Sequence, residues 1–180
     1  GVISGIPTTA GTSNFTAQVA DANLKPASAP SSITIAAPAA VASLNAWTNL
    51  YSAAPSNTSA TNLNVGSFTV GSGSNRLLLV AVVMEIGTAA NPTISASYGG
   101  TALTLAKVTA NTQREIVWVG YLKESQIGSG SKALTITYSG ATGKASALHV
   151  KWAAFSGVNQ TTPIVSSGGT NTASTSATFG

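Results

Sequence analysis

Few residues in this chain could do acid–base chemistry. Across 180 residues there are four acidic side chains and a single histidine, namely Asp21, Glu85, Glu115, Glu124 and His149. A glycosidase needs two carboxylates facing each other across a cleft. Glu85 and Glu115 each bound an apolar segment, so they could be neighbours in one sheet. We favour a simpler interpretation, in which they are surface residues at strand ends or partners of Arg76 and Arg114.

The histidine does not predict an active site either. His149 lies between Leu148 and Val150 in an alternating segment, which places it on the face opposite Trp152. A Ser–His–acid triad of the hydrolase type needs a serine on a strand–turn–helix elbow, and no such pattern occurs. One histidine and no cysteine cannot form a histidine- or thiolate-rich metal centre. We therefore expect no enzyme activity, no cofactor and no metal site.

Two aromatic residues could form a platform for a sugar ring. Trp47 and Tyr51 are four positions apart in a segment without clear periodicity, and we expect both to be exposed. Trp118 and Trp152 lie within apolar strands and are expected in the core. Aromatic residues make up 6% of the chain, which is lean for a carbohydrate-binding module. Binding of a glycan or receptor at Trp47 and Tyr51 is therefore our second hypothesis.

The composition favours assembly. Hydrophobic residues make up 43% of the chain, enough for a core, whereas charged residues make up only 7%. An ordinary domain carries about 25% charged residues, which keep its molecules apart in solution. The net charge of +4 comes from scattered bases without a cluster, so we expect no nucleic-acid partner.

No stretch is long enough to cross a membrane as a helix. The longest apolar run, 77–84, is flanked by Arg76 and Glu85. A spanning helix needs about 20 apolar residues. We expect a buried central strand here, covered on both faces, and no membrane span.

The first segment, residues 1–38, contains turns and short strands. A strand is expected over 13–20, with Phe15, Ala17 and Val19 on one face, and another over 32–36. The intervening stretch 26–32 is rich in Ala, Pro and Ser, and we expect it to be flexible.

Residues 39–180 are expected to form one antiparallel β-sandwich. Apolar and alternating segments recur every ten to fifteen residues, separated by Gly- and Ser-rich turns, and no amphipathic helix is visible. The strands are expected at 76–86, 94–98, 101–108, 115–122, 133–138 and 146–155. A further alternating segment ends at Phe68 and Val70, and Gly99-Gly100 predicts a hairpin turn.

Two resemblances add to these patterns. GVISGIPTTAG, FTAQV and DAN, within residues 1–36, resemble the later half of Ig-like, cadherin-like modules of large bacterial surface proteins. Residues 60–165 are similar to a second secreted bacterial β-sandwich module, through NRLLLV, YGGTAL and FSGVNQTTPI. The resemblance implies an all-β chain with an Ig-like half-domain at 1–38, an extracellular location and no catalytic residues to transfer. It also implies that Asp21 and Asn23 occupy a place where such modules can bind calcium, although a turn is the better interpretation.

Together these features predict a structural or adhesive module of a bacterial cell-surface fibre, filament or adhesin. Because the strands that precede residue 1 in the Ig-like modules are not in the sequence, we expect the half-domain to be completed by strand addition. The partner is expected to be a neighbouring copy, joined head to tail, or a neighbouring domain. The expected assembly interface is an apolar set of residues: Val2, Ile3, Ile6, Phe15, Ala17, Val19, Ile33 and Ile35.

Overall fold

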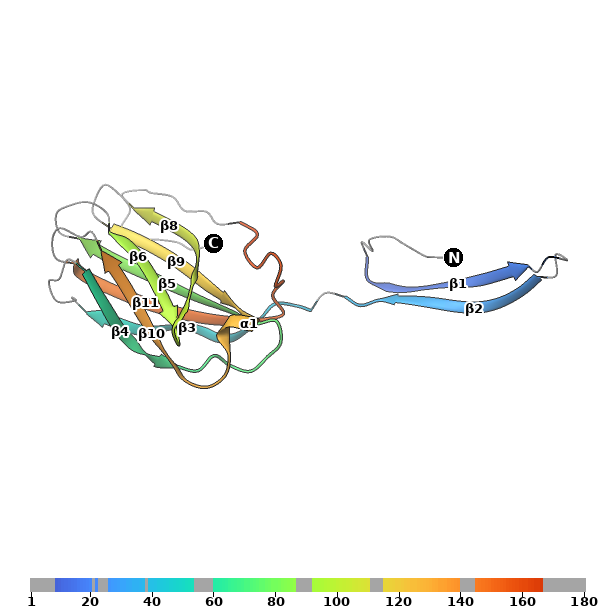
Figure 1. Cartoon of the computed structure of the whole chain (residues 1–180), viewed down its shortest axis with the longest axis horizontal. Helices are drawn as coiled ribbons and strands as arrows, with labels where there is room; N and C mark the ends of the chain where they lie inside the picture. The colour runs from blue at the N-terminus through green and yellow to red at the C-terminus, as the bar shows by residue number, and fades with distance from the viewer. Residues whose placement is uncertain are drawn as a thin grey trace. The chain divides into compact units, whose positions relative to one another are not determined.

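The computed structural model is an all-β protein that divides into two units, Gly1–Ala39 and Ala40–Gly180 (Figure 1). The structure describes residues 9–20, 22, 26–37, 39–53, 60–86, 92–110, 115–139 and 145–166. All strand pairs within these ranges are antiparallel.

The described part of the first unit is a two-stranded hairpin of β1 (Gly11–Ala20) and β2 (Pro26–Ile35). The strand expected over 13–20 is confirmed. The expectation of a flexible stretch at 26–32 is wrong, because β2 runs through both of its prolines without a register shift. Proline is compatible with a strand when its nitrogen faces an open edge, and among the described strands β2 pairs on one side only.

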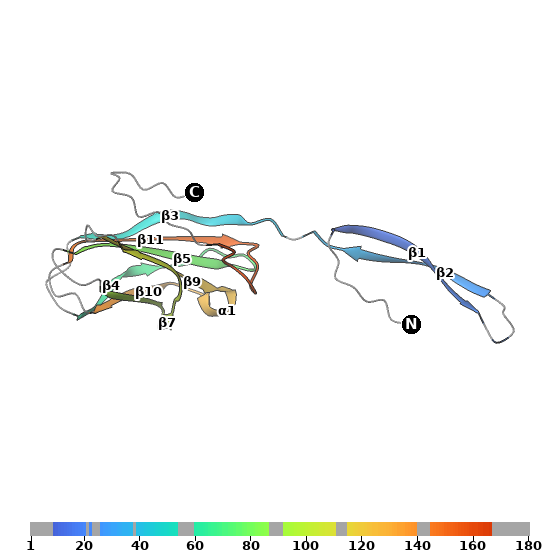
Figure 2. The ribbon, with the colours of Figure 1, turned by 90° about the horizontal axis from the view of Figure 1, so that it is seen from above.

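The second unit is a β-sandwich of two antiparallel sheets. One sheet has the order β4 (Ala60–Phe68), β10 (Lys132–Ser139), β6 (Thr93–Tyr98) and β7 (Thr101–Ala102). The other has the order β3 (Ala42–Ala53), β11 (Ala145–Ser156), β5 (Leu77–Ile86), β9 (Glu115–Lys123) and β8 (Thr104–Ala110). Figure 2 shows the two sheets stacked as layers. This confirms the all-β, antiparallel sandwich expected from the alternating segments.

The core lies between the sheets and follows the strand alternation. Along β5, Leu78, Val80, Val82 and Met84 are completely buried. Their register partners on β9 and β11 include Trp118 and other buried apolar residues, so all these side chains share one face. From the opposite sheet, β10 contributes Leu134, Ile136 and Tyr138, as its alternating pattern predicts.

An aromatic stack joins the two layers. The ring of Phe68 lies 3.9 Å from that of Trp152 and 4.7 Å from that of Tyr98, centroid to centroid. The hydroxyl of Tyr98 donates a 2.7 Å hydrogen bond to the carbonyl oxygen of Phe68. Burial raises the pKa of Tyr98, so the phenol remains protonated and keeps this bond. Trp118 and Trp152 are both buried, as expected.

The expectation that the central strand would be covered on both faces is wrong. β5 is indeed the middle strand of its sheet. However, Leu79, Ala81 and Val83 point away from the core and are partly exposed. A sandwich covers one face of each sheet, and in the described residues no third layer lies over the outer face of β5.

The segment expected as one strand over 101–108 is two strands. After the Gly99-Gly100 turn, which is confirmed, β7 pairs with β6 in the four-stranded sheet. The chain then passes to the five-stranded sheet, where β8 pairs with β9. Leu103, between the two strands, is buried and anchors the change of sheet.

α1 (Glu124–Ile127) is a single helical turn after β9. Among the described residues, no helix has the length and apolar character needed to cross a membrane.

Candidate functional site: the N-terminal hairpin

The register of the hairpin separates its residues into two chemically different faces. Residues opposite each other share a face, and residues two apart along a strand share it too. Phe15 lies opposite Ser31, Ala17 opposite Ala29 and Val19 opposite Ala27. The same face carries Ile33 and Ile35, which lie opposite Ser13 and Gly11. We call this set, Phe15, Ala17, Val19, Ala27, Ala29, Ile33 and Ile35, the apolar face.

The other face of the hairpin is polar. Its pairs are Thr12 with Thr34, Asn14 with Ser32, Thr16 with Pro30 and Gln18 with Ser28. The hydroxyl groups of Thr12 and Thr34 are 3.1 Å apart and hydrogen-bonded across the strands. The hydroxyl and amide groups of this polar face can hydrogen-bond to water, whereas the aliphatic and aromatic side chains of the apolar face cannot.

The apolar face is uncovered within its own unit. Phe15 is 37% exposed, Ile33 38% and Val19 70%. In the described residues of this unit, no further strand or helix packs on the hairpin. The structure thus places the five described residues of the expected assembly interface on one side of one hairpin. Val2, Ile3 and Ile6, as well as Asp21 and Asn23, lie outside the described residues.

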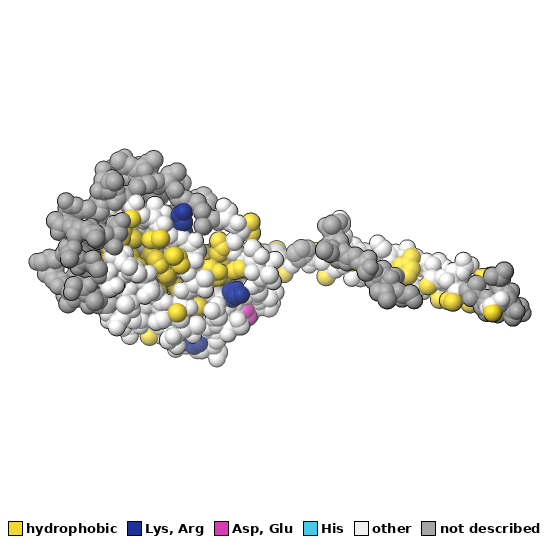
Figure 3. Space-filling view, turned by 45° about the horizontal axis from the view of Figure 1, so that its top comes forward, with side chains coloured by type: hydrophobic (Ala, Val, Ile, Leu, Met, Phe, Trp, Pro, Cys, Tyr) yellow, Lys and Arg dark blue, Asp and Glu magenta, His cyan; other side chains and the backbone are white. Residues whose placement is uncertain are grey.

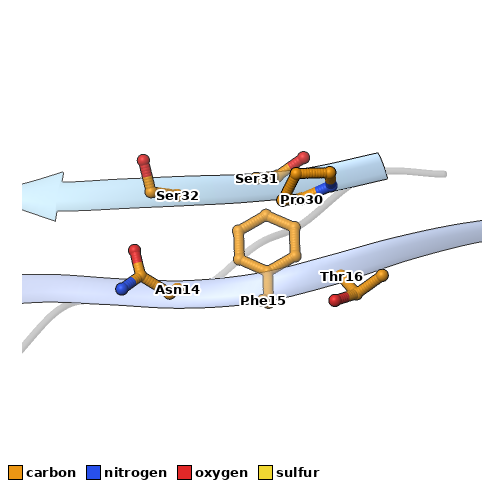
Figure 4. Close-up of a pocket in the computed structure, with 6 residues that line it drawn as sticks. All are labelled: Asn14, Phe15, Thr16, Pro30, Ser31 and Ser32. Atoms are coloured by element: carbon orange, nitrogen blue, oxygen red, sulfur yellow. The ribbon is translucent and has the colours of Figure 1, made fainter. Parts of the chain in front are cut away.

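A shallow depression marks the middle of the hairpin. Its volume is 420 Å³, and it is lined by three consecutive cross-strand pairs, namely Asn14, Phe15 and Thr16 with Ser32, Ser31 and Pro30. Figure 4 shows the ring of Phe15 extending from β1 toward β2. Because one layer of strands cannot enclose a ligand, this depression offers a surface for packing rather than a binding cavity.

The two residues expected to bind a ligand differ in their surroundings. Trp47 is 52% exposed and lies at an irregularity of β3, where the register with β11 shifts. Tyr51 pairs with core-facing Val150, is partly buried and packs against the hydrophobic core. The expectation of exposure is confirmed for Trp47 and wrong for Tyr51.

The outer face of the five-stranded sheet carries the residues that suggested acid–base chemistry. Glu85 and Glu115 are direct register partners on β5 and β9, as the pattern of strand ends allowed, and both are exposed residues at strand ends, as the favoured interpretation has them. The hydroxyl of Ser52 is 2.8 Å from Nδ1 of His149, and both residues are exposed. Ser52 was not identified from sequence, because the register between β3 and β11 brings it there. Within the described ranges, no three His, Cys, Asp or Glu side chains group as metal ligands.

Glu124 has the role of ion-pair partner that was considered for Glu85. Its carboxylate accepts hydrogen bonds from the guanidinium of Arg76, the shortest 2.6 Å, and from the backbone N–H of Arg76 at 2.8 Å. These bonds hold the pKa of Glu124 below its ordinary value. Gln160 completes the cluster: its carbonyl oxygen accepts from the Glu124 backbone N–H, and its amide donates to the Arg76 carbonyl oxygen.

This cluster of Arg76, Glu124 and Gln160 has a structural role. It links the start of β5, the start of α1 and the segment after β11, three places far apart in sequence. Two of them lie in NRLLLV and FSGVNQTTPI, the motifs that carry the resemblance of residues 60–165. In the same region, the backbone N–H of Gly157 donates to Ser74 and that of Val158 donates to Asn75.

A second apolar surface lies at the β8 edge of the sandwich. Leu105 is 51% exposed and Val108 48%, although their partners Gly120 and Trp118 belong to the core side of the sheet. On the face of the sandwich seen in Figure 3, hydrophobic side chains gather with few charged groups among them. The inner face of the five-stranded sheet is therefore incompletely covered at this edge.

Comparison with known proteins adds no relative: no family model, curated protein or solved structure matches the chain. The functional interpretation therefore rests on the chain's own geometry, in which the most distinctive surface is the apolar face of the hairpin.

Proposed function

We propose that this chain is a structural module of an extracellular bacterial surface fibre, filament or adhesin. In this proposal the hairpin is an incomplete, Ig-like half-domain that strands from a neighbouring copy or domain complete. The observation that carries the proposal is the apolar face, which the described part of its unit leaves uncovered. No catalytic role is proposed.

The energetics of the hairpin support this proposal. A two-stranded hairpin is marginally stable in water, because it has no second layer against which to bury side chains. Covering large apolar side chains such as Phe15, Val19 and Ile33 would contribute about 1.5–3 kcal/mol for each one fully buried. A partner that covers this face would therefore stabilise the hairpin and become bound to it in the same step.

The low charge of the chain supports close packing of copies. Charged residues make up 7% of the sequence, and neither hairpin strand contains any. Neutral surfaces approach without the repulsion that keeps charged proteins apart. If copies join head to tail, the contact is heterologous and does not close, so a filament grows.

Two variants on opposite faces of the hairpin test the proposal. Phe15→Lys places a charge on the apolar face, whereas Ser28→Lys places the same charge on the polar face. We expect the unmodified protein to form regular assemblies in electron micrographs and in sedimentation at neutral pH. Phe15→Lys should abolish them, and Ser28→Lys should retain them. Dispersed monomers of the unmodified protein, or equal assembly by both variants, would contradict the proposal.

The exposed side chain of Trp47 supports a second candidate function, binding of a glycan or receptor. An exposed indole can stack on a sugar ring. A glycan array probed with the unmodified protein and with Trp47→Ala tests it. Signals that disappear in the variant would support glycan binding, and an array at background level would exclude it for the glycans displayed.

A further inference from the structure

The two edges of the hairpin differ in their capacity to pair with another strand. β2 contains Pro26 and Pro30, which are four residues apart and therefore have the same orientation in the strand. Proline has no N–H, and in strands its nitrogen faces an open edge rather than a paired neighbour. The outer edge of β2 therefore lacks two of its N–H donors, which is a known protection against pairing with a further strand.

The outer edge of β1 has no such protection. Pro30 lies opposite Thr16 and Pro26 opposite Ala20. Opposite residues in an antiparallel pair both point their backbone groups outward or both inward. Thr12, Asn14, Thr16 and Gln18 therefore direct N–H and C=O groups away from β2. β1 contains no proline and no charged residue, the features by which natural proteins usually blunt an edge.

We propose that the outer edge of β1 pairs with β1 of a second copy of this chain, in antiparallel orientation. The inference rests on the proposed function and names the edge and the partner through which assembly begins. A second β1 suits this edge because that strand is uncharged, has the same length and presents the same outward N–H and C=O groups. Such a contact is self-complementary about a two-fold axis.

Apolar and polar residues alternate along β1, so this pairing places the apolar residues of both copies on the same side of the sheet. With Thr16 opposite Thr16 of the second copy, Phe15 lies opposite Ala17 of the second copy and Ser13 opposite its Val19. The two apolar faces then join on one side of a four-stranded sheet. Pairing at β2 would instead meet the missing donors at Pro26 and Pro30. The two-fold contact by itself closes on two copies, and a second layer of copies on the joined apolar face would continue the assembly.

Proline substitutions on the two edges test the proposal with matched chemistry. Thr16→Pro removes an outward N–H at the centre of the β1 edge, whereas Ser28→Pro removes one from the already blunted edge of β2. Because the symmetric contact loses two N–H···O bonds, we expect Thr16→Pro to weaken self-association about tenfold or more. Ser28→Pro should leave the dissociation constant, measured by analytical ultracentrifugation, unchanged.

Cysteine cross-linking gives a second measurement that does not depend on proline being tolerated. The chain has no native cysteine. In the proposed register the two Thr16 Cα atoms would be about 5.5 Å apart, within the range that a disulfide spans. Oxidation should convert Thr16→Cys to a covalent dimer and leave Asn14→Cys and Ser28→Cys uncross-linked.

The outcomes separate this inference from the proposed function. Loss of association in Thr16→Pro alone, with the Thr16→Cys dimer, supports both. Assemblies that form normally with Thr16→Pro, or a dimer from Ser28→Cys instead, would overturn β1 pairing while leaving the structural function standing. An unmodified protein that remains monomeric would overturn both.

Discussion

In the sandwich, β10 alternates between buried and partly exposed residues, and Leu134 and Ile136 are completely buried beneath the opposite sheet. In the hairpin, β1 alternates between apolar and polar residues over 15–19, yet Phe15 remains 37% and Val19 70% exposed. The two regions therefore contain the same kind of strand in different surroundings. One region has a second layer within the described part of its unit, and the other does not.

The difference shows what alternation means physically. A period of two decides which side chains share a face, because successive residues point to opposite sides of a strand. It does not decide whether that face is covered. The hairpin has an apolar face that a second layer could cover, but its described residues contain no such layer.

The largest contrast is expected from truncation of one side chain in each region. Leu134→Ala empties a fully buried site in the sandwich, so we expect the free energy of unfolding to fall by about 2–5 kcal/mol. Ile33→Ala in the hairpin should leave sandwich unfolding unchanged. Denaturant titration followed by tryptophan fluorescence measures this, because Trp47, Trp118 and Trp152 all lie in the sandwich unit. An effect of Leu134→Ala below that of Ile33→Ala would contradict the assigned core.

The next largest effect is expected at Gly120. A Cβ at this position would overlap the indole of Trp118, which lies over the glycine within the core. We expect Gly120→Ala to cost about 1–3 kcal/mol by overpacking, measured by the same titration. In a background carrying Trp118→Leu the cost of Gly120→Ala should shrink. Equal costs in both backgrounds would show that the indole is not the obstacle.

A smaller effect on the stability of the sandwich is expected when the pH is lowered. Arg76 holds the pKa of Glu124 below its ordinary value of 4.5. The ion pair therefore stabilises the sandwich above that value, and the stabilisation is lost as the pH falls through the lowered pKa. We expect the melting temperature to decline in this acidic range and Glu124→Gln to flatten the decline. A variant with the same acid dependence as the unmodified protein would exclude this ion pair as its source.

Assembly through the hairpin should depend on pH much less than the stability of the sandwich does. Neither β1 nor β2 contains a titratable side chain. Assembly through these strands should therefore change little over the pH range in which Glu124 titrates, as sedimentation would show. A steep loss of assembly in that range would indicate a contribution from titratable residues outside the two strands.

The smallest effect on stability is expected at Trp47. This side chain is 52% exposed, so Trp47→Ala should change the free energy of unfolding by no more than about 0.5 kcal/mol. The variant therefore tests ligand binding without damage to the fold. A loss of several kcal/mol would place the indole among the structural residues of the sandwich.

Regular strands were predictable and irregular ones were not. β5, β9, β10 and β11 follow apolar or alternating patterns, and the structure confirms them close to their expected bounds. β3 was missed because register shifts against β11 break its period of two. β2 was predicted too short, because prolines that usually end strands are accepted at an open edge.

The clusters of interacting side chains were less predictable than the strands. Arg76, Glu124 and Gln160 come together because two strand ends and a loop meet at one end of the sandwich. No local pattern carries that information, although Arg76 and Gln160 both lie in motifs that carry the resemblance of residues 60–165. Ser52 and His149 likewise meet only through the register of β3 with β11.

The amino-acid pattern was enough to specify the fold class, the position of most strands and the residues that share each apolar face. These properties depend on local alternation and turn chemistry, which are readable along the chain. The three-dimensional fold was needed to establish which faces are covered, which edges of the described strands are unpaired and which charged groups pair. These properties depend on contacts between distant segments, and such contacts follow from sheet order and register rather than from any single stretch of residues.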